Sequence, residues 1–159
     1  MFIFKKKARK LNQEYNKYLS KVNVLLESTM IIDEIYTFIN NKSNRYYLWT
    51  ALLLDNGKRY PVFHISKTKN TDDLDEFVRY LPNPKIVYSD NNPVYKEFYG
   101  RINIAKKGSQ TNLIESFNAQ LRHYCSNLIR KGKSYAKSID SFISNLHMIF
   151  IQKFIYNIN

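Results

Sequence analysis

The chain of 159 residues is long enough for one ordinary domain with a hydrophobic core, and too short for two. Hydrophobic residues make up 44% of it, which excludes a disordered chain, and a single cysteine, Cys125, excludes an internal disulfide. The net charge of +12 favours polyanionic partners, although a compositional bias toward Lys, Asn, Ile and Tyr explains part of the excess. Residues 1–28 are basic, lack Gly and Pro, and carry apolar residues at helical spacing, so we predict a helix there.

Three strand-like runs follow the basic segment. The first is apolar apart from Asp33, Glu34 and Thr37. A cluster of Asn, Lys and Ser separates it from the second run, and an Asn-Gly pair, the strongest short hairpin signal, separates the second from the third. Short turns between strands predict an antiparallel meander. The three predicted strands cover residues 30–39, 45–54 and 59–66.

The pattern then changes to helices around one short buried strand, residues 85–89. A helix at 71–81 precedes that strand, and a strand, crossover helix and strand in this order predict parallel pairing. The whole order predicts an α/β protein of the ribonuclease H-like fold: a mixed central sheet, with an antiparallel three-strand meander plus parallel strands, flanked by helices. The remaining predicted elements are a short helix at 94–99, an apolar segment at 102–105, and helices at 111–130 and 135–156.

Several other classes of protein are disfavoured. The basic N-terminus has no signal peptide pattern, and the most apolar stretch, residues 142–156, is too short and too polar to span a bilayer. His64, His123 and His147 are scattered, without the spacing of zinc ligands. We therefore expect a cytoplasmic, nucleoid-associated protein without a membrane partner.

Three acids are candidates for chemistry, and each has a structural alternative. Asp33 lies within an apolar strand, where carboxylates are rare unless paired or metal-bound, but a strand end can also reach solvent. Asp90 follows the buried strand, but an Asp before Asn-Asn-Pro also forms a turn through its own side chain. Glu115 lies in the first turn of the long helix, where it can form a capping box with Asn112.

The three acids together carry a stronger argument than any one of them. If the first strand pairs beside the 85–89 strand, Asp33 and Asp90 become neighbours, and the following helix can set Glu115 opposite them. Converging carboxylates repel each other unless a cation neutralises them, and oxygen ligands favour Mg²⁺ or Mn²⁺. Two such ions about 4 Å apart would activate the attacking oxygen and stabilise the leaving oxygen of a phosphodiester.

Several short segments accompany the three acids: Asp33-Glu34, Arg45-Tyr46-Tyr47-Leu48-Trp49, Tyr88-Ser89-Asp90, Lys106-Lys107, and Thr111 to Asn118 with Leu121-Arg122. The first and second acids are separated by 56 residues (90 − 33 − 1), and the second and third by only 24 (115 − 90 − 1). In these segments and in the short second gap, the chain resembles the DDE transposases of the insertion-sequence-one (IS-one) family over roughly residues 30–150.

The resemblance implies a magnesium-dependent enzyme that hydrolyses a phosphodiester at element ends and joins the freed 3′ hydroxyl to target DNA. It makes Asp33, Asp90 and Glu115 both catalytic residues and ligands of two Mg²⁺ or Mn²⁺ ions. Asn118 and Arg122, beyond Glu115 on the helix, would steady the substrate or the acid. The predicted phosphate contacts, for which a solvated basic surface is the alternative, are Lys106, Lys107, Arg130, Lys131 and Lys133.

The resemblance also divides the chain into a DDE catalytic domain at residues 29–159 and the basic helical segment 1–28. Family members carry a zinc-binding and helix-turn-helix region ahead of the catalytic domain, and we interpret residues 1–28 as the end of such a region in a truncated copy or in one of two reading frames. Expected partners are DNA, both element ends and target, and further copies of the chain or a full-length transposase. Two alternatives stay open: an inactive, transposase-derived DNA-binding or inhibitory protein, and a ribonuclease H-like nuclease or resolvase.

Overall fold

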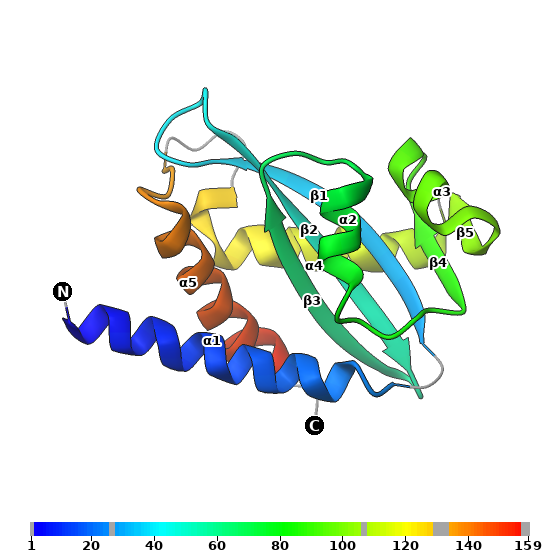
Figure 1. The fold of residues 1–159 in the computed structure, drawn as a ribbon, viewed down its shortest axis with the longest axis horizontal. Coiled ribbons are helices and arrows are strands. Elements are labelled where there is room, and N and C mark those ends of the chain that lie inside the picture. Colours follow the sequence, from blue (N-terminus) through cyan, green and yellow to red (C-terminus); the bar gives the residue numbers. More distant parts are fainter. Residues whose placement is uncertain (1, 26–27, 106–107, 129–133, 157–159) are drawn as a thin grey trace.

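A mixed five-stranded sheet forms the centre of the protein, in the order β3-β2-β1-β4-β5 (Figure 1). The computed structural model describes residues 2–25, 28–105, 108–128 and 134–156, with side chains of the first helix from Lys5 onward. The first three strands form the predicted antiparallel meander, and β1–β4 and β4–β5 pair in parallel. The strands are β1 (Thr29–Phe38), β2 (Arg45–Asp55), β3 (Lys58–Ser66), β4 (Ile86–Ser89) and β5 (Asn103–Ala105).

The meander forms where apolar runs meet strong turn signals. Asn56 and Gly57 take left-handed backbone angles, φ 48° and 77°, which match the right-handed twist of the strands that they join. The inner strands β1 and β2 are buried at half or more of their positions, and β2 includes Trp49, whose side chain is fully buried. These two strands therefore provide a rigid platform for any side chain that they carry.

Helices cover both faces of the sheet (Figure 1). In this view α4 crosses behind the strands and α2 lies in front of them. α3 follows β4 and packs against α2. The helices are α1 (Phe2–Val22), α2 (Thr71–Val78), α3 (Pro93–Tyr99), α4 (Ser109–Tyr124) and α5 (Ile139–Ile149), with 3-10 turns at Gly100–Ile102 and Ser126–Leu128 and a π-helical segment at Phe150–Ile155.

The basic helix α1 shares the core of the rest of the protein. Tyr15 and Tyr18 are buried, and the Tyr18 hydroxyl donates to the carbonyl of Pro61 at 3.0 Å. The Tyr15 ring lies 4.8 Å from the ring of Phe63, and its hydroxyl accepts from the Phe63 amide at 2.9 Å. The apolar stripe predicted for residues 1–28 therefore packs on the edge strand β3. The division of the chain at residue 28 stays a prediction.

Several helices differ from their predicted extent: α1 ends at Val22 rather than at residue 28, α2 at Val78 rather than at residue 81, and α4 at Tyr124 rather than at residue 130. α4 begins at Ser109, because the Thr111 hydroxyl accepts from the Gly108 amide at 2.9 Å and donates to the Gly108 carbonyl at 3.0 Å. Asn112 then lies inside the helix, where its amide donates to the Gly108 carbonyl, so it forms no capping box with Glu115. The last predicted helix is an α-helix only over α5, and it continues as the π-helical segment Phe150–Ile155.

Among the described residues, no helix combines the length and the apolar character needed to cross a membrane.

Candidate active site

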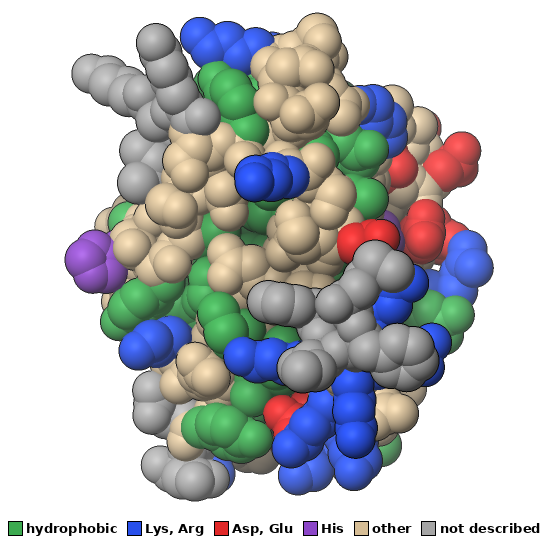
Figure 2. Space-filling view, turned by 90° about the vertical axis from the view of Figure 1, so that its left-hand side faces the viewer, with side chains coloured by type: hydrophobic (Ala, Val, Ile, Leu, Met, Phe, Trp, Pro, Cys, Tyr) green, Lys and Arg blue, Asp and Glu red, His purple; other side chains and the backbone are tan. Residues whose placement is uncertain are grey.

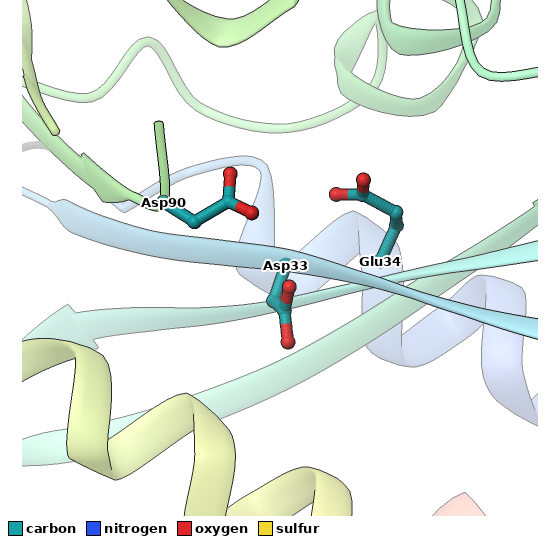
Figure 3. A group of neighbouring side chains, drawn as sticks. All are labelled: Asp33, Glu34 and Asp90. Carbon is teal, nitrogen blue, oxygen red and sulfur yellow. The ribbon is translucent and has the colours of Figure 1, made fainter. Parts of the chain in front are cut away.

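Asp33 lies in the middle of β1, where neighbouring residues point to opposite faces of the sheet. Its side chain points toward α4, and the side chain of Glu34 points away from α4 (Figure 3). Thr50, the partner of Asp33 on β2, is buried on the same face as Asp33. The Asp33 side chain therefore lies on the α4 face of the sheet.

Asp90 reaches the same place through the parallel pairing of β1 and β4. Ile31 pairs with Tyr88 in this register, so a step of two residues along each strand sets Asp90 level with Asp33. The Asp90 Oδ1 accepts from the Asn92 amide at 2.9 Å, which is the turn contact expected before Asn-Pro. Asp90 is exposed, and it points from the end of β4 toward the space between Asp33 and Glu34 (Figure 3).

Asp33, Glu34 and Asp90 form an acidic group, in which one carboxylate oxygen from each lies within 4.8 Å of the others. The pKa of Asp33 is raised to about 6, chiefly by burial and also by the charges of Glu34 and Asp90, against hydrogen bonds that lower it. Like charges at this spacing are costly unless a cation lies among them. The group has the hard oxygen donors that Mg²⁺ and Mn²⁺ prefer, so its chemistry fits a divalent ion.

Asn118 connects Asp33 to helix α4. Its side chain is 1% exposed, and its Nδ2 donates to Asp33 Oδ2 at 2.8 Å. Its Oδ1 accepts from the Thr50 hydroxyl at 2.8 Å, so both ends of the amide are held. This chain of hydrogen bonds fixes the Asp33 carboxylate against α4.

The structure does not bring Glu115 into the acidic group. Glu115 is exposed on α4, three residues before Asn118, which corresponds to an axial offset of about 4.5 Å on the same flank of the helix. Arg122, one turn beyond Asn118, is half-buried. The other predicted DNA-binding residues lie outside the described residues: Lys106, Lys107, Arg130, Lys131 and Lys133.

Basic side chains gather on a surface away from the acidic group. On the face shown in Figure 2, Lys and Arg side chains cluster over the first turns of α1. This part of the helix exposes Lys5, Lys6, Lys7, Arg9 and Lys10. A surface of this kind attracts phosphates through counterion release, whatever their sequence.

Glu34 is the site residue whose role the sequence does not indicate. Its side chain is only 8% exposed, and Lys69 Nζ lies 3.0 Å from its Oε1. The other donors are Asn92, whose Nδ2 donates to Oε1 at 2.7 Å, and Tyr95, whose hydroxyl donates to Oε2 at 2.5 Å. With both oxygens occupied, Glu34 anchors the turn that carries Asp90. An acid such as Glu34 in an apolar strand indicates that its carboxylate is paired when buried. The sequence does not identify the partners, because they lie far along the chain.

We expect Glu34→Gln to lower the free energy of unfolding by about 1–3 kcal/mol, because the substitution leaves Lys69 without its counter-charge and Tyr95 with a weaker acceptor. Urea denaturation measures this change, with the exposed Glu97→Gln on α3 as the matched control. A Glu34→Gln protein that keeps its stability but loses stabilisation by Mg²⁺ would make Glu34 a metal ligand rather than an anchor.

No family model matches the sequence, and no curated protein matches it. A chain of the cryo-EM structure of the simian T-cell lymphotropic virus intasome in complex with PP2A regulatory subunit B56 gamma aligns with a TM-score of 0.56 and 15% identity, over 82% of this chain and 50% of that chain. The HTLV-2 integrase catalytic core domain in complex with magnesium, in its dimeric form, aligns with a TM-score of 0.46 and 14% identity, over 82% of this chain and 88% of that chain.

The alignment with the intasome chain and the order of the sheet show the fold. The mixed five-stranded sheet with helices on both faces is a ribonuclease H-like fold, so the predicted fold class is confirmed. This chain spans half the length of the intasome chain that it matches. At 15% identity the likeness concerns the fold, and any activity has to be argued from the residues of the site.

Proposed function

We propose that this protein is the catalytic domain of a DDE transposase, a metal-dependent enzyme that cuts and joins DNA strands. The observation that carries the proposal is the acidic group at the junction of β1 and β4, where Asp33 and Asp90 lie beside the α4 helix that carries Glu115. Asp33, Asp90 and Glu115 would hold two Mg²⁺ or Mn²⁺ ions. Such ions polarise the phosphodiester and lower the pKa of the attacking oxygen.

Glu115 belongs to the proposed ligand set because of its place on α4. Asn118 already contacts Asp33 from this helix, and Glu115 lies on the same flank one turn earlier. The Glu115 side chain is exposed and has several rotatable bonds, so it can respond to a cation without a shift of the backbone. Asn118 would keep Asp33 in one orientation while charge in the site changes.

The proposed reaction consists of two displacements at phosphorus. A water oxygen first attacks a phosphodiester at the end of the mobile element and gives up a proton to solvent, and the 3′ oxygen leaves and takes up a proton. The freed 3′ hydroxyl then loses its proton and attacks a phosphodiester of the target, so that a new P–O bond forms as the bond to the target's own 3′ oxygen breaks, and that oxygen takes up a proton. Asp33 and Asp90 would orient the reacting phosphate, and DNA, as element end and as target, is the proposed partner.

Strand nicking on plasmid DNA tests the proposal. We expect nicking with Mg²⁺ or Mn²⁺ and none with EDTA, because the acidic group needs a cation to accept a polyanion. DNA binding without nicking under every metal condition would replace the enzyme with a DNA-binding or inhibitory protein. Preferred cleavage of an RNA–DNA hybrid or a four-way junction over plain duplex would instead favour a nuclease or resolvase.

A further inference from the structure

A groove of about 410 Å³ lies beside α4, apart from the acidic group. Its floor includes Leu52 of β2 and Phe117 of α4. Three exposed basic side chains line it: Lys58 and Arg59, at the start of β3, and Lys153, from the π-helical segment. Segments almost 100 residues apart in sequence thus bring positive charge to one hollow (153 − 59 = 94).

The charges of Lys58 and Arg59 in this groove are open to an anion. The residues that line it include no Asp or Glu. Among the described residues, the salt bridges join Lys69 to Glu34 and Arg79 to Asp75, and neither involves Lys58 or Arg59. Asp55 pairs with Lys58 in the backbone register, but its carboxylate accepts from the side chain of Asn56 at 3.0 Å. An incoming phosphate therefore displaces no carboxylate from Lys58 or Arg59.

The groove and the acidic group flank the same turns of α4. Ser116 and Gln120 line the groove, whereas Asn118 contacts Asp33 on the other flank. Each residue advances about 100° around a helix, so the exposed surface between the flanks carries the uncharged Asn112 and Ala119 together with Glu115. A polyanion can therefore pass from the acids across α4 to the groove without meeting a negative side chain there other than Glu115.

We propose that this groove holds the sugar–phosphate backbone of the DNA strand whose scissile phosphate lies at the acidic group. The inference rests on the proposed function and adds a phosphate-binding site to it. A helix with its side chains is about 10–12 Å wide. At about 3.4 Å per nucleotide, the bound phosphates lie about three nucleotides from the scissile one. Lys58, Arg59 and Lys153 contact phosphates only, so the groove reads no sequence.

The salt dependence of DNA binding tests this site. We compare Lys58→Gln/Arg59→Gln with Lys42→Gln/Lys137→Gln, a control that also removes two exposed charges, beside the turn at the other end of the β1–β2 hairpin. The probe is a fluorescent 30-base-pair duplex, titrated without divalent metal over a range of NaCl. The groove variant should lose affinity on the order of tenfold, and its plot of log K against log salt should be shallower by about 2. Adding Lys153→Gln should reduce the slope by about 1 more.

The outcomes separate the groove from the proposed chemistry. Equal slopes for the groove and control variants would overturn the groove. The proposal would also be overturned if the groove variant lost binding to poly-glutamate while its binding to the duplex stayed unchanged. The groove would then be a binding site for an acidic peptide. If the wild type does not nick DNA but the groove variant still has the shallower slope, the binding site stands and the enzyme proposal fails. Thermal melting confirms that all variants fold, since the substituted side chains are exposed.

Discussion

Asp33→Asn is expected to reduce metal-dependent nicking by on the order of 10³-fold or more, and to leave DNA affinity nearly unchanged. The substitution keeps the shape of the side chain and its contact with Asn118, but removes the charge that would hold a divalent ion. We expect the duplex to bind to basic surfaces rather than to this acid. The affinity for the duplex should therefore depend on the salt concentration and not on the charge of Asp33. Single-turnover accumulation of nicked plasmid, beside duplex titration, measures both quantities.

Asp90→Asn and Glu115→Gln should have losses of similar size, and Glu97→Gln, an exposed acid on α3, should have none. The Glu115 variant is the most informative of these, because that side chain lies outside the acidic group. A Glu115→Gln protein with full activity would remove Glu115 from the ligand set. Full activity of the Asp33 or Asp90 variant would place the chemistry elsewhere on the molecule.

The strands could be predicted closely because their signals are local. Apolar runs between turn-forming residues mark β1, β2 and β3, and the left-handed angles of Asn56 and Gly57 are those that an Asn-Gly pair adopts most readily. The helix α2 between β3 and β4 predicted a parallel partner for β4, and the pairing with β1 entered the prediction only as a condition, which the structure meets. That pairing sets Asp90 level with Asp33, so the junction of the two acids was the predictable part of the site.

The rest of the site depends on contacts that no local pattern indicates. Glu34 binds Lys69 and Tyr95, which follow it by 35 and 61 residues, and nothing in either segment marks it as a partner. The start of α4 was also beyond prediction, since Thr111 caps the helix on Gly108 where Asn112 has the more typical capping side chain. After α5, apolar spacing does not distinguish an α-helix from the π-helical turns of Phe150–Ile155.

Asp33→Asn should also make the metal-free protein more stable at pH 8, even though the variant lacks activity. The pKa of Asp33 is raised from 3.8 to about 6 in the folded protein, so the folded state holds this proton more tightly than the unfolded chain does. The resulting stability is fully present below pH 3.8 and is lost as the pH rises through about 6. Because Asp33 is only half-buried, we expect the variant to gain about 1–2 kcal/mol at pH 8, less than the full shift would give.

Mg²⁺ should reverse this order, because a cation among Asp33 and its neighbours removes the repulsion that the substitution relieves. The wild type should melt at a higher temperature as Mg²⁺ is added, following the mass action of binding to the folded state, and the Asp33→Asn variant should not respond. Asp140→Asn, which removes an exposed acid of α5, is the matched control and should behave as the wild type does. Urea unfolding at pH 4 and pH 8, with EDTA or with Mg²⁺, measures all four conditions. Two results would contradict this prediction: a wild type whose stability does not change with Mg²⁺, or an Asp33→Asn protein that is less stable than the wild type at pH 8 in EDTA. Either result would mean that the repulsion between the acids is too weak to require a cation. The proposed metal-dependent reaction would then lose its physical basis.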